Sequence, residues 1–160
     1  MNILLRNIKS EDNDAIATVI RSGLKDFDAD LPGTVYFDPT TDDLFKLFTT
    51  PLSAYFVATE DNKVIGGAGY FPTHGLPQDT CELVKMYLDN NYRGKGIGKL
   101  LLDHTMLAAN RDGFKFMYLE TLPQLNRAVE MYEKNGFIKL KAPMGDSGHF
   151  GCNMWMIKEL

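Results

Sequence analysis

The chain has 160 residues, of which 44% are hydrophobic and 24% charged, and a formal net charge of -4. This length fits a single domain over 1–160, and the composition is ordinary for a soluble globular protein. The acidic balance argues against a nucleic-acid-binding protein, which needs a basic face. No apolar run is long enough to span a membrane, and the first residues lack the apolar core of a signal peptide. We therefore expect a cytoplasmic protein that contacts neither nucleic acid nor membrane.

Cysteine and histidine residues give no sign of a structural crosslink or a metal centre. Cys81 and Cys152 could pair, but a chain of this length needs no disulfide, so two buried reduced thiols are the better interpretation. His74, His104 and His149 do not stand at metal-ligand spacing with either cysteine. We expect no metal site, and we expect His104 to pack on the apolar side of a helix.

The N-terminal third is predicted to contain one strand and two helices. Residues 3–8 alternate as a strand does, and Ser10 is the predicted N-cap of a helix that ends near Gly23. An irregular loop over 26–38 follows. A second helix is predicted over 40–48, where Pro51 prevents its continuation.

A hairpin comes next, with strands over 54–59 and 64–71 around the turn Asp61-Asn62. Glycines inside its second strand indicate a close backbone approach or a bulge. The elements predicted after it are a loop over 72–78, a strand over 82–88, a helix from Ile97 that ends before Gly113, a strand over 116–121, a helix over 126–135 closed by Gly136, and strands over 137–140 and 152–157. This order predicts a mixed α/β domain.

The segment from Arg93 to Gly98 links a strand to a helix and reads Arg-Gly-Lys-Gly-Ile-Gly. Such a loop can point successive backbone N–H groups at a phosphate or pyrophosphate, next to the positive end of the helix. Its spacing matches neither a Walker A loop nor the dinucleotide fingerprint. A glycine-rich turn without any ligand is the alternative.

Two signatures in this half of the chain resemble those of the GNAT superfamily of N-acetyltransferases. The first, Arg/Gln-x-x-Gly-x-Gly/Ala, is matched by Arg93, Gly96 and Gly98. The second, Asn-x-x-Ala-x-x-x-Tyr-x-x-x-Gly-Phe, resembles the segment 126–137, which contains Tyr132. The resemblance implies a central mixed, mostly antiparallel sheet with a splayed strand pair and helices on both faces.

The same resemblance implies that acetyl-CoA is the co-substrate and that its acetyl group passes directly to a primary amine of a small molecule or peptide. Backbone groups near Leu88 would hold the pantetheine arm and polarise the thioester, and the glycine loop would hold the pyrophosphate. The implied cofactor-binding residues are Met86, Tyr87, Leu88, Arg93, Gly94, Lys95, Gly96, Ile97, Gly98, Lys99 and Asn126. A helix cap is the alternative role for Asn126.

Two implied catalytic residues carry the chemistry. Tyr132 stands where a phenol can protonate the departing thiolate, and its alternative role is that of a core tyrosine. Glu82 stands where some family members carry a general base, and burial near an apolar cleft would raise its pKa toward the useful range. A surface salt bridge is the alternative for Glu82, with water as the base.

Other functions stay open at this point. The chain could be a non-catalytic acyl-CoA-binding module, or could use another acyl-CoA or an O-acceptor. Acidic residues near the first helices would suit a cationic acceptor, although solvation explains them equally well: Asp26, Asp28, Asp30, Asp42 and Asp43. His149 is interpreted as part of a flexible connector over 145–151 rather than as a substrate contact, and a Cys152 nucleophile is disfavoured because direct transfer needs none. A homodimer is compatible with the sequence.

Overall fold

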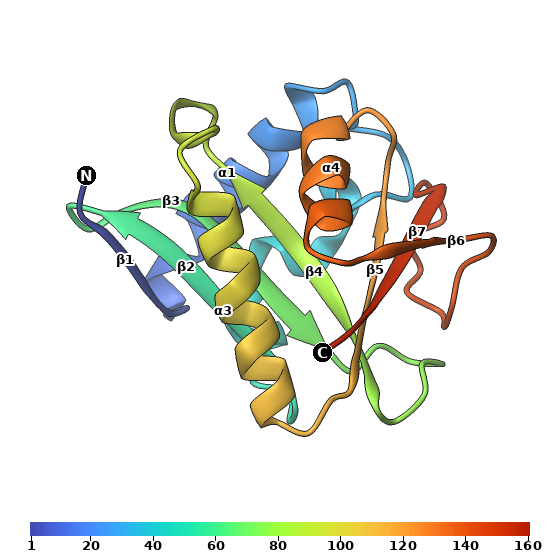
Figure 1. Cartoon of the computed structure of the whole chain (residues 1–160). Helices are drawn as coiled ribbons and strands as arrows, with labels where there is room; N and C mark the ends of the chain where they lie inside the picture. Colours follow the sequence, from blue (N-terminus) through green and yellow to red (C-terminus); the bar gives the residue numbers. More distant parts are fainter.

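Seven strands form one sheet in the order β1-β2-β3-β4-β5-β7-β6 in the computed structural model, which describes residues 1–160 (Figure 1). All neighbouring strands are antiparallel except β4 and β5, which are parallel. The strands are β1 Ile3–Asn7, β2 Ala54–Glu60, β3 Lys63–Phe71, β4 Thr80–Leu88, β5 Phe116–Thr121, β6 Ile138–Leu140 and β7 Met154–Glu159. The predicted mixed, mostly antiparallel sheet is confirmed.

Helices cover both faces of this sheet, as predicted (Figure 1). They are α1 Asn13–Lys25, α2 Leu44–Leu47, α3 Ile97–Arg111 and α4 Asn126–Lys134. Leu101 of α3 and Val129 of α4 belong to one buried cluster, whereas Ile16 and Ile20 of α1 belong to a second cluster on the opposite face. None of these helices combines the length and the apolar character that crossing a bilayer requires.

Two predictions for the N-terminal helices were wrong in detail. Ser10 does not cap α1, because a 3-10 turn over Ser10–Asp12 precedes the helix. The helix predicted over 40–48 is a 3-10 turn over Pro39–Asp42 followed by the single turn of α2. Asp43 separates them, since its backbone leaves the helical region and its carboxylate accepts the N–H of Lys46.

The glycines of β3 allow the close approach that the sequence predicted. A Cβ on Gly67 would lie 2.6 Å from Cε1 of Tyr55, and a Cβ on Gly69 would lie 2.6 Å from another atom of the same ring. The register of β3 against β4 also shifts between these two glycines. The ring of Tyr55 therefore occupies space that side chains in β3 would need.

The parallel pair β4–β5 is splayed and creates the site. Its pairing is confined to Thr80, Cys81 and Glu82 of β4 against residues 116–118 of β5. Beyond Glu82 the two strands diverge, while β4 remains paired with β3 up to Leu88. The result is a V whose apex lies at Glu82 and whose mouth lies where β4 leads into the glycine loop.

Candidate active site

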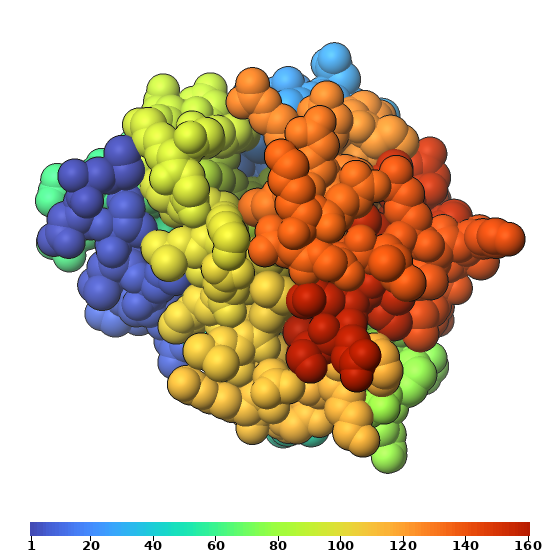
Figure 2. All heavy atoms as spheres, viewed as in Figure 1, coloured from blue at the N-terminus to red at the C-terminus, as the bar shows by residue number.

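A cleft of about 600 Å³ opens at this V. Its walls come from β4, β5, the start of α3 and one side of α4, and from Leu24, Phe27 and Val35 beneath the opposite face of the sheet. In Figure 2 the surface is hollowed between the yellow-green segment that contains the glycine loop and the orange segment that contains α4. The cleft thus reaches through the sheet where β4 and β5 diverge.

The glycine loop has the geometry of an anion-binding turn. Gly94 and Gly96 have φ values of 75° and 81°, in the left-handed region that favours glycine, and a Cβ at either would meet nothing within 4 Å. Gly96 is the N-cap of α3 and no side chain caps this helix. The free N–H groups of the first turn and the open space in front of them suit a phosphate.

The structure places eight of the eleven predicted cofactor residues on the cleft wall: Met86, Tyr87, Leu88, Arg93, Gly94, Gly96, Gly98 and Lys99. The other three are not on it. Ile97 is buried in the core, and Lys95 lies over the ring of Tyr92 at 5.3 Å. Asn126 is exposed, and its side chain accepts the N–H of Arg127 at 2.8 Å. It also stands one residue closer to Ala128 than the signature requires.

Arg93 anchors the loop. Its Nε donates to the carbonyl of Leu88 at 3.0 Å, and its Nη2 lies 2.9 Å from a carboxylate oxygen of Asp26 at the end of α1. The guanidinium also lies 5.0 Å from the centre of the Phe27 ring. The positive charge of Arg93 is therefore used to join the loop to α1, and the backbone of the loop is left to meet a ligand.

The backbone of Leu88 faces the gap in the sheet. The N–H of Asp89 donates to the carbonyl of Ile65 at 2.8 Å, so Asp89 and Ile65 form a hydrogen-bonded pair between β4 and β3. Opposite residues of an antiparallel ladder alternate between hydrogen-bonded and non-hydrogen-bonded pairs, so the next pair, Leu88 with Gly66, is not hydrogen-bonded. The N–H and C=O of Leu88 consequently point away from β3. This orientation leaves the N–H of Leu88 as a donor at the mouth of the V.

Tyr132 of α4 is both a packed tyrosine and a wall of the cleft. Its ring centre lies 5.6 Å from that of Phe137, and the residue is 6% exposed. The hydroxyl of Tyr132 makes no hydrogen bond to the protein. Every fully buried side-chain polar atom of the structure has a hydrogen-bond partner, so this hydroxyl is not fully buried and opens into the cleft that Tyr132 lines. Burial raises the pKa of Tyr132, which keeps the proton on this hydroxyl at neutral pH.

Glu82 lies at the apex of the V and is 3% exposed. Its Oε2 accepts a hydrogen bond from the hydroxyl of Thr73 at 2.5 Å, and no lysine or arginine pairs with it. Burial raises the pKa of Glu82 to about 7, and the nearby carboxylate of Glu120 acts in the same direction. The surface salt bridge considered for Glu82 is wrong, because the residue is buried in the cleft.

The sequence did not single out Glu120, Asp38 or Lys85. Glu120 lies on β5, where Tyr118 donates to it at 2.7 Å and Ser147 donates to its other oxygen. Its carboxylate, that of Glu82 and a ring nitrogen of His149 all lie within 4.8 Å of one another. These three side chains are also potential metal ligands, so the expectation of no metal stays a prediction.

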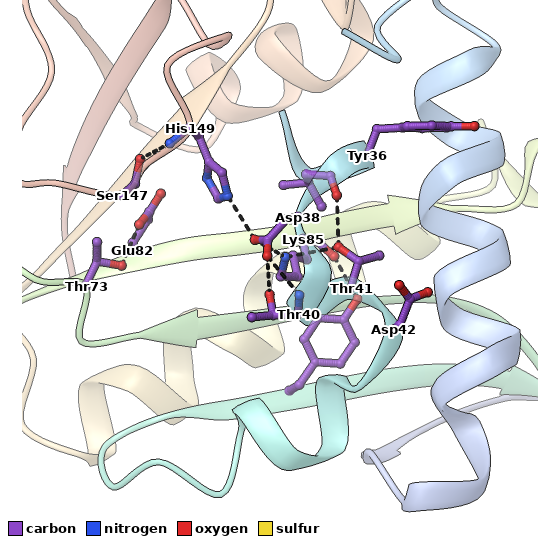
Figure 3. A network of polar contacts seen from close by, with 12 residues as sticks. Tyr36, Asp38, Thr40, Thr41, Asp42, Thr73, Glu82, Lys85, Ser147 and His149 are labelled. Atoms are coloured by element: carbon purple, nitrogen blue, oxygen red, sulfur yellow. Dashed lines mark hydrogen bonds and ion pairs between the residues drawn. The ribbon is translucent and has the colours of Figure 1, made fainter. Parts of the chain in front are cut away.

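Figure 3 shows how Asp38 joins His149 to Lys85. One oxygen of Asp38 lies 3.1 Å from Nε2 of His149 and 2.9 Å from Nζ of Lys85. Desolvation lowers the pKa of Lys85, while hydrogen bonds from His149 and the charge of Lys85 hold the pKa of Asp38 well below its usual range. The sequence did contain a signal for Lys85, because a charged residue in the middle of an apolar strand needs a buried partner.

The connector that contains His149 is tied to the rest of the fold rather than loose. Besides the contact with Asp38, Gly151 donates to the carbonyl of Gly33 at 2.9 Å and Asp146 donates to that of His74 at 2.8 Å. His149 therefore lines the cleft from a fixed segment. On α3, His104 packs edge-on against Phe56 at 4.5 Å, as predicted for a packed histidine.

Both cysteines are free thiols, as expected. Cys81 is fully buried, whereas Cys152 is half-buried and lines the cleft. Burial raises the pKa of the Cys152 thiol to about 12, so the thiol stays protonated at neutral pH. A protonated thiol is a poor nucleophile, which argues against covalent catalysis by Cys152.

A splayed parallel pair, a glycine loop at its mouth and a buried carboxylate at its apex line one cleft. The model of the family described as "Acetyltransferase (GNAT) family" matches residues 21–137. The protein "Uncharacterized N-acetyltransferase YjgM" of Escherichia coli is 39% identical over 159 residues, which are 98% of this chain and 95% of that protein. The chain belongs to the GNAT family of acetyltransferases.

Solved structures show the same fold at low identity. A GNAT-family acetyltransferase from Staphylococcus aureus superposes with a TM-score of 0.84 at 20% identity, covering 99% of each chain. The PaiA N-acetyltransferase of Thermoplasma acidophilum, crystallised in complex with coenzyme A, superposes with a TM-score of 0.77 at 22% identity over 100% of each chain. These likenesses support the fold, including its mixed sheet and its splayed strands.

Proposed function

We propose that this protein is an acetyl-CoA-dependent N-acetyltransferase that transfers the acetyl group directly to a primary amine of a small molecule or peptide. The observation that carries the proposal is the cleft itself, which holds an anion-binding loop at its mouth and a buried proton acceptor at its apex. Family membership and a neighbour crystallised with coenzyme A support the choice of co-substrate.

The cofactor end of the proposal uses the glycine loop and the start of α3. Backbone N–H groups from Gly94 to Gly98 would bind the pyrophosphate, and Lys99, whose ammonium group pairs with Asp103, lies on the same wall. Lys95 and Ile97 would contribute through their backbones, since their side chains lie off the cleft. We propose no contact between the side chain of Asn126 and the cofactor, because the Oδ1 atom of Asn126 accepts a hydrogen bond from the backbone N–H of Arg127.

Proton transfers are assigned to Glu82 and Tyr132. The attacking nitrogen must lose a proton to become nucleophilic, and a carboxylate with a pKa of about 7 is well matched to accept it near neutral pH. Glu82 lies six residues before Leu88 on β4, about 20 Å along the strand, so the proton would reach it through water in the cleft rather than by direct contact. As the new N–C bond forms and the C–S bond breaks, the N–H of Leu88 would stabilise negative charge on the carbonyl oxygen. The hydroxyl of Tyr132 would then protonate the leaving thiolate.

Two measurements test this function in order. Acetyl-CoA and CoA should raise the melting temperature by binding to the folded state, whereas NADH and ATP should have much smaller effects. Stabilisation by NADH without stabilisation by CoA would contradict the assignment of the loop. Release of free thiol from acetyl-CoA, dependent on an added primary amine, would then separate an enzyme from a binding module that only retains acyl-CoA. An amine-independent rate equal to the amine-dependent rate would contradict the proposed transfer.

A further inference from the structure

Three side chains from different parts of the chain meet at the apex of the V. A carboxylate oxygen of Glu82, one of Glu120 and a ring nitrogen of His149 all lie within 4.8 Å of one another, and all three residues line the cleft. Two hydrogen bonds of ordinary length that share a water molecule join atoms about 4.5–5.5 Å apart. One water molecule at this place can therefore contact Glu82, the proposed proton acceptor, together with both of its neighbours.

Asp38 determines which nitrogen of His149 is left for such a water molecule. Nε2 lies 3.1 Å from a carboxylate oxygen of Asp38, and in Figure 3 the imidazole ring lies between Asp38 and Glu82. Against the effect of burial, the hydrogen bond from His149 and the charge of Lys85 hold the pKa of Asp38 well below its usual range, so this carboxylate stays ionised and only accepts. Nε2 is therefore the donor, and Nδ1 meets the water, as an acceptor in the neutral ring and as a donor in the imidazolium ion.

The ring of His149 is held in place before any ligand arrives. Its side chain is 15% exposed, and its backbone N–H donates to Oγ of Ser147 at 3.1 Å. The hydroxyl of Ser147 in turn donates to Glu120. Lys85 donates to the same carboxylate oxygen of Asp38 at 2.9 Å, so the group that anchors the ring is itself fixed. A ring held in this way can orient a water molecule without losing further freedom during the reaction.

We propose that His149 is a positioning residue that holds the last water molecule on the proton path from the acceptor amine to Glu82, and this proposal rests on the proposed function. As an N–H bond of the ammonium group breaks, its proton enters the water molecules of the cleft. The water held by His149 receives a proton and passes one of its own to Glu82, which becomes a carboxylic acid. Glu120 accepts the other hydrogen of this water, and the amine is left neutral and able to attack the thioester.

A crystal structure of the unliganded protein tests the water molecule without reference to any acceptor. We expect a water molecule within about 3.2 Å of His149, Glu82 and Glu120 in the unmodified protein and none there in His149→Gln. Glutamine keeps an amide N–H for Asp38 but offers no group in the place of Nδ1. An empty apex in the unmodified protein or a water retained in His149→Gln would overturn the proposal. So would an ion at about 2.0–2.2 Å, which is the distance of a bound metal.

Turnover tests the role of the ring in the reaction. With the best acceptor among tyramine, cadaverine and glycylglycine, His149→Gln should lower kcat about 100-fold, as a misplaced group on a reaction path does. KM for acetyl-CoA should stay within about threefold, because the glycine loop lies at the other end of the cleft. His74→Gln, at an exposed histidine outside the cleft, should retain kcat within about twofold.

Small ring compounds separate this role from a purely structural one in His149→Ala. Free imidazole should restore kcat at least about tenfold, because it offers one nitrogen to Asp38 and a second one to the water. Pyrrole has the same ring size and an N–H for Asp38 but no second nitrogen, so it should fill the space without restoring turnover. Equal rescue by pyrrole would show that the ring serves packing alone and would overturn the proposal.

The outcomes also distinguish this proposal from the proposed function. Unchanged kcat in a folded His149→Gln protein would overturn the proposal and leave amine acetylation with Glu82 as the base. If the unmodified protein released no thiol with any of the three amines, the proposed function and the proposal would both fall. Should His149→Ala fail to fold, His149→Gln, which keeps a donor for Asp38, still provides the kinetic test.

Discussion

The ammonium group of Lys85 lies 2.9 Å from the carboxylate of Asp38, and the side chain of this lysine is only 3% exposed. Lys85 has a φ of 51°, so the strand twists locally and directs the side chain out of the ladder toward Asp38. The same carboxylate contacts His149. The carboxylate of Asp38, which lies before α2, thus holds together the middle of β4 through Lys85 and the connector between the last two strands through His149.

Asp38→Asn should destabilise the protein by about 3–5 kcal/mol, because it leaves the buried charge of Lys85 without its partner. The folded state holds the pKa of Asp38 well below 3.8, so its contribution is complete above that pH and lost as the pH falls further. Urea unfolding at neutral pH measures the loss. Asp42→Asn, which breaks the largely exposed pair with Arg21, should cost less than about 1 kcal/mol. A smaller loss for Asp38→Asn than for this control would contradict the role of the buried pair.

Gly98→Val should remove CoA binding without unfolding the protein. The φ of Gly98 is not positive, and a Cβ there would lie 3.6 Å from Sδ of Met131 and 3.9 Å from Cε of Met86, which is ordinary contact distance. The added methyl groups would enter the cleft and occupy space that the phosphate end needs. Calorimetry should show at least about tenfold weaker affinity, since each 1.4 kcal/mol corresponds to that factor. Leu107→Val, on the exposed side of the same helix, is the control and should retain affinity.

Tyr132→Phe should keep the packing against Phe137 and the affinity for CoA, and should lower kcat by about 10²–10⁴-fold as a lost general acid does. Single-turnover kinetics should show that the chemical step is slowed. Tyr70→Phe, which removes a hydroxyl bonded to Asp112 outside the cleft, should leave kcat within about twofold, because it touches no reacting group. Near-full turnover by Tyr132→Phe with chemistry rate-limiting would assign the proton to solvent.

Glu82→Gln should remove the acidic limb of the pH–rate profile. In the unmodified protein kcat/KM should fall below about pH 7, because protonated Glu82 cannot accept the proton of the amine. The variant should be slow and should not show this limb. A limb of the same midpoint in Glu82→Gln would identify another residue as the base.

Glu82→Gln, which should slow the reaction, should also stabilise the folded protein. The folded state raises the pKa of Glu82 from 4.5 to about 7, so the folded protein binds this proton more tightly than the unfolded chain. Ionised Glu82 therefore penalises the folded state above pH 7, and the penalty fades as the pH falls from 7 to 4.5. Glu82→Gln should stabilise the protein by about 1–3 kcal/mol at pH 8 and by much less at pH 4.5. Melting temperatures across this range provide the measurement.

Much of the fold could be predicted from local patterns. Alternation and helical spacing report burial within one element, and they located the hairpin around Asp61 and the helices α1, α3 and α4. The helix predicted over 40–48 failed because apolar residues such as Leu44 and Leu47 have helical spacing, while Asp43 ends one turn and caps the next. Hydrophobic spacing does not report such a break.

In the candidate site, too, some residues can be found from a local sequence pattern and others only from the fold. Gly96 and Tyr132 stand within the two signatures and Glu82 stands eleven residues before the first of them, so a sequence pattern can find all three, although their roles as cofactor and catalytic residues stay predictions. Asp38 and Glu120 come from segments with no signature and meet Lys85, Glu82 and His149 only through the fold. Their charge states depend on burial, which no local pattern contains.

The position of β7 between β5 and β6 has a consequence for how the protein is made. β6 pairs only with β7, and β7 also pairs with β5 over residues 116–121, on the edge opposite the short parallel contact with β4. During synthesis these strands leave the ribosome before Met154–Glu159, so β6 waits without a partner and β5 exposes an open edge. The wall of the cleft that contains Glu120 is therefore among the last parts of the molecule to form, and a nascent chain lacking its final strand has neither a finished sheet nor a complete cleft.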